Sequence, residues 1–475
     1  MDNDFLRNHN SVTTQAARNL ATTTKSLLMM EEITPRWILQ FLPWVNVTAG
    51  TYRVNRIKVL FKGEGKISIT ERDGRLLVEP DQLRQISLFY GTTAEELSLL
   101  ADSFIVEQYH KDQVIVSEGD SANKLYIVAK GVVEATTLGE REQKVQIGIL
   151  SSGDYFGEFA LLENKPYNAT ITALSASSIL TIDCDKFNSL LNKYPELRKR
   201  LEQNRRSRDE WSVKTNEYGE HKISIQAGHE GEYELPETFV DYIEQPREYP
   251  LSIVQTVIKV HTRVTDLYND PINQLEEQVR LTVEAIKEKQ EWELINNKKF
   301  GLLHSVAPSM RLQPRYGPPT PDDMDELLSR VWKKPAIFLA HPKAIAAFGR
   351  ECTKRGVPPV TVTIQGSPFL TWRGVPIVPC NKMLVDGKSK CNGNTGSTKI
   401  LLMRLGEKEQ GVIGLHQLGI PDEIMPSLSM RMMGIDNKAL ASYLLTLYFS
   451  AAVLTDDALA CLENVEVGFY HNYPI

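Results

Sequence analysis

Residues 156–170 have the sequence FGEFALLENKPYNAT, and this stretch carries the sharpest local signal in the chain. Gly157 opens a turn into a short helix, whose exposed backbone N–H groups can cradle a phosphate. The carboxylate that follows, Glu158, can accept hydrogen bonds from ribose hydroxyls. A glycine-led turn is a weak signal alone, so its meaning depends on the sequence around it.

Short apolar runs surround this stretch on both sides. A helical segment over 83–97 comes first, and within it Thr93 and Glu96 have the spacing of a capping box. A helix over 185–204 closes the region. Short strands separated by Gly-Asp turns are typical of a small antiparallel barrel or jelly roll, which we expect over residues 80–206. The expected strands are 114–116, 125–128, 131–135, 146–150, 169–173 and 178–182.

This region resembles a cyclic-nucleotide-binding domain. The family's phosphate-binding pattern matches at Gly157, Glu158, Ala160, Leu161, Pro166, Ala169 and Thr170, and the chain departs from it at Tyr167. The resemblance implies an arginine at that position, pairing with the cyclic phosphate, and tyrosine cannot replace a bidentate guanidinium. We therefore expect weak or absent binding of cyclic AMP and cyclic GMP, with no cofactor required. The candidate nucleotide-binding residues are Gly157, Glu158, Phe159, Ala160, Tyr167, Asn168 and Ala169.

The sequence before this region has two parts of different character. Residues 1–30 are rich in Ser, Thr, Asn and Ala, and they predict an arm that becomes ordered only against partners. Residues 34–44 are dense in aromatic side chains and must be buried. The pair Thr34-Pro35 has the form of a helix N-cap followed by proline at the first helical position. Alternating apolar residues over 51–61 predict a strand.

The sequence after the barrel region returns to extended character and then to helix. Apolar residues at 223–225 and 238–242 suggest a long hairpin. A stripe of Leu275, Val279, Val283 and Ile286 predicts a long helix from about 272 to 297. Residues 322–425 alternate helix and strand, with strands expected at 335–339, 359–364, 375–378 and 399–405 and helices at 324–332 and 341–354. The apolar run 443–454 predicts a buried helix over about 436–454, because it is too short to span a membrane.

A second resemblance covers residues 1–79 and 207–475. The segments 33–44, 50–56, 234–242, 276–297 and 430–435 resemble family 2 encapsulin shell proteins. The resemblance implies the HK97 phage-capsid fold, an α+β architecture with an N-arm, an extended loop, a spine helix and an α/β apical domain. An encapsulin interrupted by a cyclic-nucleotide-binding domain is the type 2B arrangement. The expected divisions are 1–30 as the N-terminal arm, 31–79 with 207–321 as the capsid peripheral domain and extended loop, 80–206 as the inserted domain, 322–425 as the apical domain and 426–475 as the C-terminal capsid segment.

This second resemblance implies a non-enzymatic protein whose copies close into an icosahedral nanocompartment, expected to be T=1. Arms and extended elements of this kind are surfaces for contact with other copies, and heterologous contacts that close under rotation make shells. The resemblance also implies a cargo enzyme in the lumen, commonly from terpenoid or isoprenoid metabolism. The expected localisation is the bacterial cytoplasm, with neither nucleic acid nor membrane as a partner.

Composition and motifs exclude several other classes. The 475 residues carry 54 basic and 60 acidic side chains, a balance that argues against non-specific nucleic-acid binding. Five scattered cysteines without a CxxC pair predict a reduced protein without a metal site. The sequence contains no HExxH, GxSxG or Walker A motif, so we expect no catalytic residues. The first ten residues lack the apolar region of a secretory signal.

Two alternative functions stay open at this stage. The first is a cyclic-nucleotide-responsive regulator of the transcription-factor class, although no paired short helices follow the barrel region as that class requires. The second is an enzyme gated by a nucleotide, with a pocket in the α/β region 322–425. A size measurement separates these alternatives from a shell, since only a shell has megadalton mass.

Overall fold

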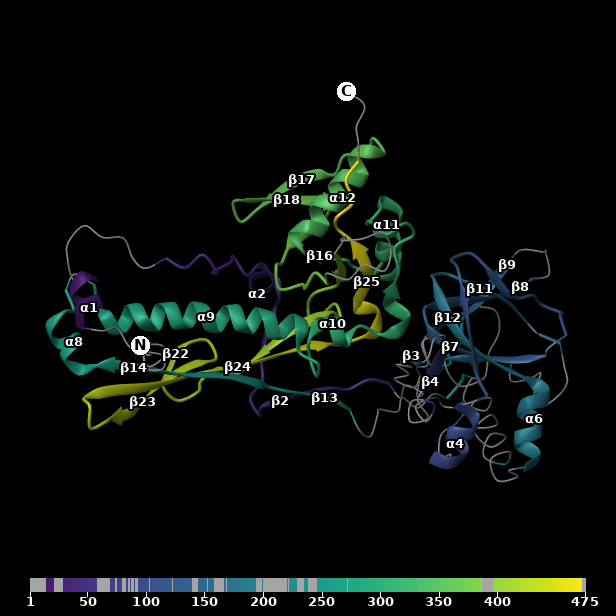
Figure 1. Ribbon diagram of the computed structural model, residues 1–475, viewed down its shortest axis with the longest axis horizontal. Helices are drawn as coiled ribbons and strands as arrows, with labels where there is room; N and C mark the ends of the chain where they lie inside the picture. Colours follow the sequence, from purple (N-terminus) through teal and green to yellow (C-terminus); the bar gives the residue numbers. More distant parts are fainter. Residues whose placement is uncertain are drawn as a thin grey trace.

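The computed structural model describes most of the chain (Figure 1). The described residues are 14–20, 29–57, 69–72, 75–78, 93–138 except 102 and 122, 144–157 except 152, 166–193 except 168, 246–386 except 271, and 396–471, with residues 83, 86, 89, 199, 220, 222–228 and 235–237 between them. An elongated portion built on a long helix and a large sheet lies beside an α/β unit, and a β-barrel stands at one end of both.

The barrel consists of two four-stranded sheets. One has the order β10-β7-β12-β5, formed by Tyr155–Phe156, Lys124–Lys130, Ser177–Asp183 and Ile105–Tyr109. The other has the order β6-β11-β8-β9, formed by Val114–Val116, Thr170–Ala173, Val132–Leu138 and Lys144–Ser151. Val128, Val133 and Ile171 fill the space between the sheets. The antiparallel barrel expected from the short runs is confirmed.

Two helices cover the outer side of the first sheet. Helix α4 spans Ala94–Ala101 and α6 spans Cys184–Lys193. Buried side chains from both helices, among them Leu97 and Phe187, form a second apolar cluster with Leu125 and Leu180 of the sheet. At the start of α4 the carboxylate of Glu96 accepts hydrogen bonds from the backbone N–H and hydroxyl of Thr93, at 3.0 and 2.8 Å, as the capping-box spacing predicts.

The elongated portion pairs helix α9, Gln274–Asn296, with a six-stranded sheet. The order is β1-β21-β24-β23-β22, and β14 also pairs with β24. These strands are Trp44–Asn46, Val412–His416, Leu440–Val453, Leu428–Ile435, Glu423–Met425 and Ser252–His261. Asn273 caps the helix by accepting a hydrogen bond from the backbone N–H of Glu276. Figure 1 shows α9 running along β14 and β24, so the expected spine helix is confirmed.

The α/β unit has a seven-stranded sheet of the order β15-β25-β20-β16-β19-β18-β17. The strands are Arg311–Leu312, Leu459–Glu466, Ser397–Met403, Ile337–Ala340, Val375–Pro379, Ser367–Trp372 and Val360–Ile364. Helices α11, Pro321–Arg330, and α12, Pro342–Lys354, pack on it. Short helices connect the parts: α8 (Thr262–Leu267), α10 (Leu302–Ser305) and η2 (Pro308–Met310). Strand β25 therefore joins the α/β sheet, whereas β21 joins the elongated sheet.

Segments from before the barrel are built into sheets with segments from after it. Strand β1 is parallel to β21, and Trp44 pairs with Gly414. Strand β2, Thr51–Val54, pairs with β13, Arg247–Pro250. Helix α2, Trp37–Phe41, is packed by aromatic side chains, with Trp37 lying edge-on against Phe369 at 5.1 Å between ring centroids. The remaining described elements are a hairpin of β3 and β4, at 69–72 and 75–78, the short helix α1, Thr14–Leu20, and the 3-10 helix η3, Asp456–Ala458.

Three expectations about secondary structure are wrong. The run 440–453 is a strand, because β24 lies between neighbours on both sides and is buried on both faces, so its apolar residues are nearly continuous. Helix α2 begins at Trp37 with Arg36 before it at φ 50°, so Thr34-Pro35 is not its cap. Residues 223–225 form no strand; the expected partner 238–242 lies outside the described residues, and the extended pairings in this region are made by β13 and β14.

No helix in the described part of the chain combines the length and the apolar character that crossing a bilayer requires.

Candidate functional site

Gly157 begins the predicted phosphate cradle, and its backbone conformation requires glycine. Its φ is +85°, and a Cβ at this position would lie 2.7 Å from the carbonyl oxygen of Lys124 and 3.3 Å from the ring of Tyr167. Any larger residue would therefore have to move the edge of strand β7. The structure also describes Pro166, Tyr167, Ala169 and Thr170 of this stretch; Glu158, Phe159, Ala160, Leu161 and Asn168 lie outside the described residues.

Tyr167 occupies the position at which the nucleotide-binding pattern has arginine. Its hydroxyl donates a hydrogen bond to the carbonyl oxygen of Lys124 at 3.1 Å and accepts one from the backbone N–H of the same residue at 3.3 Å. Its own backbone N–H donates to Asp120, and its carbonyl accepts from Gly119. The tyrosine thus connects the end of the cradle to the start of β7 and to the turn after β6.

A cluster of polar and aromatic side chains surrounds Tyr167. Lys124 forms an ion pair with Glu107 at 2.9 Å, and the same carboxylate accepts hydrogen bonds from Tyr109 at 2.5 Å and Thr181 at 3.1 Å. Burial acts to raise the pKa of Glu107, but Lys124 and these hydrogen bonds hold that pKa below its ordinary value. The Lys124 ammonium is consequently engaged with Glu107 and is not a free cation for a phosphate.

Tyr126 links this cluster to the barrel interior. Its ring stacks on Phe156 with 4.8 Å between centroids and lies 6.3 Å from the ring of Tyr167. Burial, followed by the proximity of Tyr167, raises the pKa of Tyr126 above the ordinary tyrosine value. The described side chains at this site are therefore neutral or already paired, and they suit apolar or hydrogen-bonded contact better than pairing with an anion.

A second candidate site lies where the chain enters the elongated portion. Glu288 of helix α9 is only 8% exposed. It accepts hydrogen bonds from the backbone N–H of Thr34 at 2.7 Å and from the Thr34 hydroxyl at 3.0 Å. Lys382 and Arg36 form ion pairs with the same carboxylate at 2.6 and 3.2 Å. Burial opposes ionisation, but these partners lower the pKa of Glu288 below its ordinary value.

Glu291 lies one turn further along α9, and its pKa is raised where that of Glu288 is lowered. It is 2% exposed, and burial together with the nearby charge of Glu288 raises its pKa to about 7, although Lys382 and Arg36 act to lower it. The entering segment is thus held by one ionised carboxylate, with a second carboxyl beside it that gains a proton readily.

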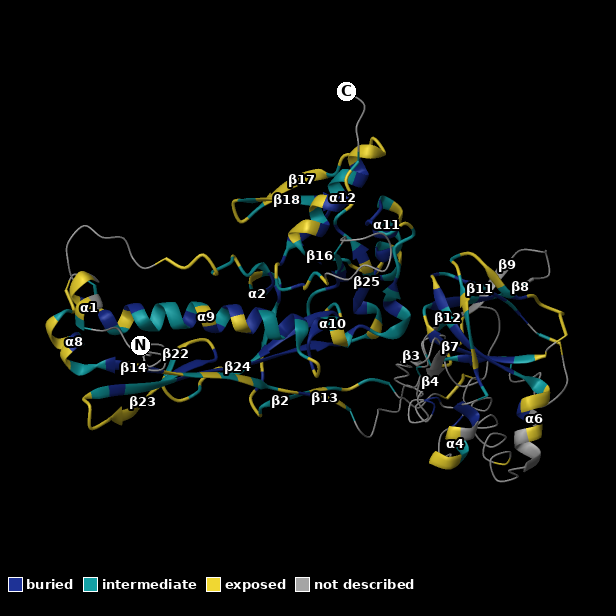
Figure 2. Ribbon diagram, in the orientation of Figure 1, coloured by how far each residue is buried: buried dark blue, intermediate teal, exposed yellow. Residues whose placement is uncertain are grey.

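Exposed apolar side chains gather on the strands of the elongated sheet. Ile253 and Val257 of β14 are 46% and 37% exposed, and they pair across the sheet with Tyr448 and Leu444 of β24. Most of β23 is exposed (Figure 2), including Met432, Met433 and Ile435. A cavity of about 450 Å³ lies nearby between α2, α9 and residues 425–428. Exposed apolar side chains grouped in this way are typical of contact with another macromolecule.

The described residues were also searched for metal-binding groups and for reactive cysteines. Among the described residues, no group of three or more His, Cys, Asp or Glu side chains is placed to hold a metal ion. Burial raises the pKa of the Cys352 thiol to about 11 and those of Cys380 and Cys461 to about 12. These three thiols are therefore poor nucleophiles at neutral pH.

Comparison with known proteins accounts for both parts of the chain. Residues 208–469 match the family described as "Type 2A encapsulin shell protein SrpI-like", and residues 106–194 match the cyclic nucleotide-binding domain family. The type 2A encapsulin shell protein SrpI of Synechococcus elongatus is 59% identical over 252 residues, which are 53% of this chain and 80% of that protein. Human cGMP-dependent protein kinase 2 is 35% identical over 122 residues, covering 25% of this chain and 16% of the kinase.

A solved structure extends the likeness beyond the matched family segment. The cryo-EM structure of the holo-SrpI encapsulin complex from Synechococcus elongatus PCC 7942 aligns with a TM-score of 0.55 and 36% identity, covering 97% of this chain and 98% of that one. These matches define a shell protein of the α+β capsid type that carries a cyclic nucleotide-binding domain. The chain belongs to the type 2A encapsulin shell protein SrpI-like family.

This result corrects one expectation and supports another. The assignment to type 2B is wrong, because both the matching family and its named relatives are of type 2A; the inserted domain had suggested type 2B. The relatives are named shell proteins, a structural role, in agreement with the expected non-enzymatic chain. Sequence reasoning missed the roles of Glu107, Lys124 and Glu288, and it gave Thr34 only a helix-capping role. Glu107 and Lys124 are 17 positions apart and Thr34 and Glu288 are 254 apart, so no short motif joins either pair.

Proposed function

We propose that copies of this chain assemble into a closed icosahedral shell, of T=1 symmetry, in the bacterial cytoplasm. The observation that carries the proposal is the match of residues 208–469 to a shell-protein family. The exposed apolar residues of β14 and β23 support it, because such residues lose contact with water when copies meet. A closed shell needs heterologous contacts that repeat under rotation, and an elongated subunit offers separate surfaces for them.

The test is the size and shape of the purified protein. We expect hollow, uniform particles of megadalton mass in negative-stain images and in light scattering, without nucleic acid. A monodisperse monomer or dimer across a range of concentration and salt would refute assembly. That result would favour the alternative, a cyclic-nucleotide-responsive regulator of the transcription-factor class, which forms small oligomers.

We further propose that the lumen holds a cargo enzyme. Support comes from the shell-protein family, since an enclosed volume serves to separate a reaction from its surroundings. The expectation of a terpenoid or isoprenoid enzyme came with the type 2B resemblance, so it remains a prediction without further support. Purification of particles from the native host, followed by mass spectrometry of the proteins protected from added protease, identifies the cargo. Particles that protect no second protein would contradict this proposal while leaving assembly intact.

For the barrel we propose weak or absent binding of cyclic AMP and cyclic GMP. The supporting observation is Tyr167, whose hydroxyl is used by the backbone of Lys124 where the pattern has a phosphate-pairing arginine. Loss of one charge-assisted hydrogen bond lowers affinity by about one to two decades. Calorimetry on assembled particles with each nucleotide tests this. Micromolar or tighter binding would show that the arginine is dispensable here.

We also propose the division of the chain stated above, with 1–30 as the arm and 80–206 as an inserted domain. Support comes from the separate apolar clusters of the barrel and the elongated portion. Removing 80–206 and joining residue 79 to 207 by a short linker should still give shells. Aggregation of that protein would mean that the barrel belongs to the assembly surface. Deleting 1–30 should weaken closure while leaving the barrel folded.

A further inference from the structure

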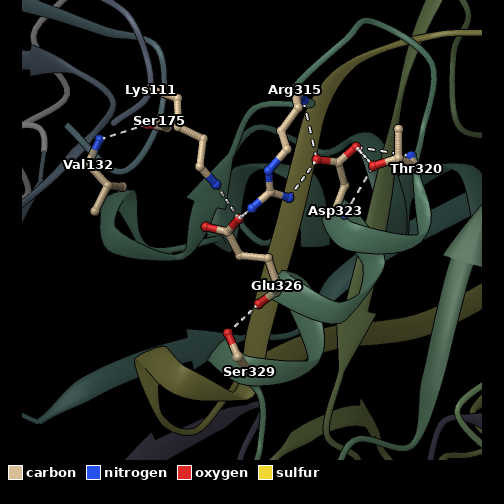
Figure 3. A network of polar contacts seen from close by, with 8 residues as sticks. All are labelled: Lys111, Val132, Ser175, Arg315, Thr320, Asp323, Glu326 and Ser329. Atoms are coloured by element: carbon tan, nitrogen blue, oxygen red, sulfur yellow. Dashed lines mark hydrogen bonds and ion pairs between the residues drawn. The ribbon is translucent and has the colours of Figure 1, made fainter. Parts of the chain in front are cut away.

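The barrel contacts the α/β unit of its own chain at helix α11. Figure 1 shows the two side by side, and strand β9 lies against the short helix η2. Lys111 lies in the turn between β5 and β6, and its ammonium is 2.9 Å from the carboxylate of Glu326 on α11 (Figure 3). The two side chains are only 23% and 20% exposed, so water screens this ion pair less than it screens a surface pair.

Glu326 is fixed in place from the α11 side. Arg315 donates to the Glu326 carboxylate at 2.9 Å and to Asp323 at 3.2 Å. Asp323 in turn accepts hydrogen bonds from the backbone N–H and hydroxyl of Thr320, completing the capping box of the helix. Figure 3 shows this chain of contacts leading from the helix start to Lys111. The barrel therefore meets a carboxylate whose position is already set.

A second charged residue of α11 is a cation, Arg330, and the barrel residue that acts on it is an anion, Glu134. Arg330 lies four residues after Glu326, on the same face of α11. Burial lowers the pKa of Arg330, while the negative charges of Glu326 and of Glu134 on barrel strand β8 oppose that shift. The barrel thus places the ammonium of Lys111 against Glu326, and the charge of Glu134 acts on Arg330, one helical turn further along α11.

We propose that α11 is the docking surface for the inserted barrel, and that these reciprocal charges set its orientation on the shell portion of the same chain. Rotating the barrel so that the two sites exchange would bring Lys111 to Arg330 and Glu134 to Glu326. Both contacts would then be repulsive, so the charge pattern selects one orientation rather than merely attracting the two surfaces. The contact with α11 thus holds the barrel non-covalently, in addition to the two chain segments that connect the barrel to the rest of the protein.

The first test uses the unmodified assembled protein. A zero-length carbodiimide reagent joins an amine and a carboxylate that are in direct contact, and mass spectrometry should find a peptide linking Lys111 to Glu326. Lys130, an exposed lysine of the same barrel, is the internal control and should give no link to Glu326. Absence of the Lys111 link while other contacting lysine–carboxylate pairs are joined would overturn the proposal.

The second test is cryo-EM of particles carrying single charge changes. In Lys111→Glu particles we expect the barrel density beside α11 to weaken relative to the shell, whereas Lys111→Arg and the control Lys130→Glu should match the unmodified protein. Glu134→Lys should act like Lys111→Glu, and adding Arg330→Glu to it should restore the density. Hydrogen exchange in β7 checks that each barrel is folded. Unchanged barrel density in folded Lys111→Glu and Glu134→Lys particles would show that these charges do not set the orientation.

Discussion

The hydroxyl of Tyr167 and the backbone of Lys124 exchange two hydrogen bonds, one in each direction, at 3.1 and 3.3 Å. This relationship assigns a structural role to the residue that departs from the nucleotide-binding pattern. The Tyr167 ring also lies close to Gly157, since a Cβ at that glycine would be 3.3 Å from it.

The substitution Tyr167→Phe keeps the ring and removes both hydrogen bonds. We expect the free energy of unfolding of the barrel to fall by about 1 kcal/mol, measured by denaturant titration of the full chain with a barrel-specific hydrogen-exchange readout. Tyr167→Arg should instead strengthen binding of cyclic AMP if the cradle is otherwise intact. If the Tyr167→Phe variant is as stable as the unmodified protein, the Tyr167 hydroxyl makes no measurable contribution to the stability of the barrel.

The substitution Gly157→Ala forces a Cβ toward the Lys124 carbonyl in a left-handed backbone. We expect a loss of about 3 kcal/mol, since backbone strain and a steric clash add. Gly119→Ala is the matched control, because Gly119 has a similar φ of +87° but open space where the Cβ would be placed. It should cost only about 1–2 kcal/mol. Equal losses in the two variants would indicate that the clash is relieved by small movements.

Two lysine–glutamate pairs with the same 2.6 Å separation test what burial contributes. The side chains of Lys382 and Glu288 are 12% and 10% exposed, whereas those of Lys334 and Glu409 are 63% and 40% exposed. Lys382→Met leaves a buried carboxylate short of a partner and should destabilise the protein by about 3 kcal/mol. Lys334→Met should change stability by less than about 1 kcal/mol. Similar small effects from both would mean that Arg36 and Thr34 suffice to hold Glu288.

Glu291 predicts a particular dependence of stability on pH. Its pKa is raised from 4.5 to about 7 in the folded protein, so between these values the folded state holds a proton that the unfolded chain has released. Stability from this group is therefore present at low pH and lost as pH rises from about 4.5 to about 7. Denaturant titrations should show a weaker decline in this window for Glu291→Gln than for the exposed control Glu276→Gln. Parallel pH profiles would refute the assignment.

Local sequence signals predicted the parts of the fold whose cause is local. The stripe of Val283 and Ile286 predicted α9, and the capping spacing of Thr93 and Glu96 predicted the start of α4. The same reasoning predicted a helix for the run 440–453, which is a strand. A strand buried on both faces and a buried helix both have continuous apolar sequence, so the run alone does not distinguish them. Its neighbours β14 and β21, which decide the matter, are distant in the chain.

The candidate sites were predictable only where a short pattern carried them. Gly157 and Tyr167 stand in such a pattern, and the structure gives each a defined role. Glu288 has no local pattern, because its partners Thr34 and Lys382 lie far away in sequence on either side. The Lys111–Glu326 pair joins residues separated by 215 positions, and only the folded chain brings their charges together.

The pairing of β1 with β21 has a consequence for how this chain is made. Strand β1, which contains Trp44, has no strand to pair with until Gly414 of β21 has been synthesised, 370 positions later. At about 5–20 residues per second, a ribosome takes about 20 to 70 seconds to cover that distance. The barrel is synthesised within that interval and its contacts are closer in sequence, so it should fold first during translation. Nascent chains should therefore carry a folded barrel while the elongated sheet is still incomplete.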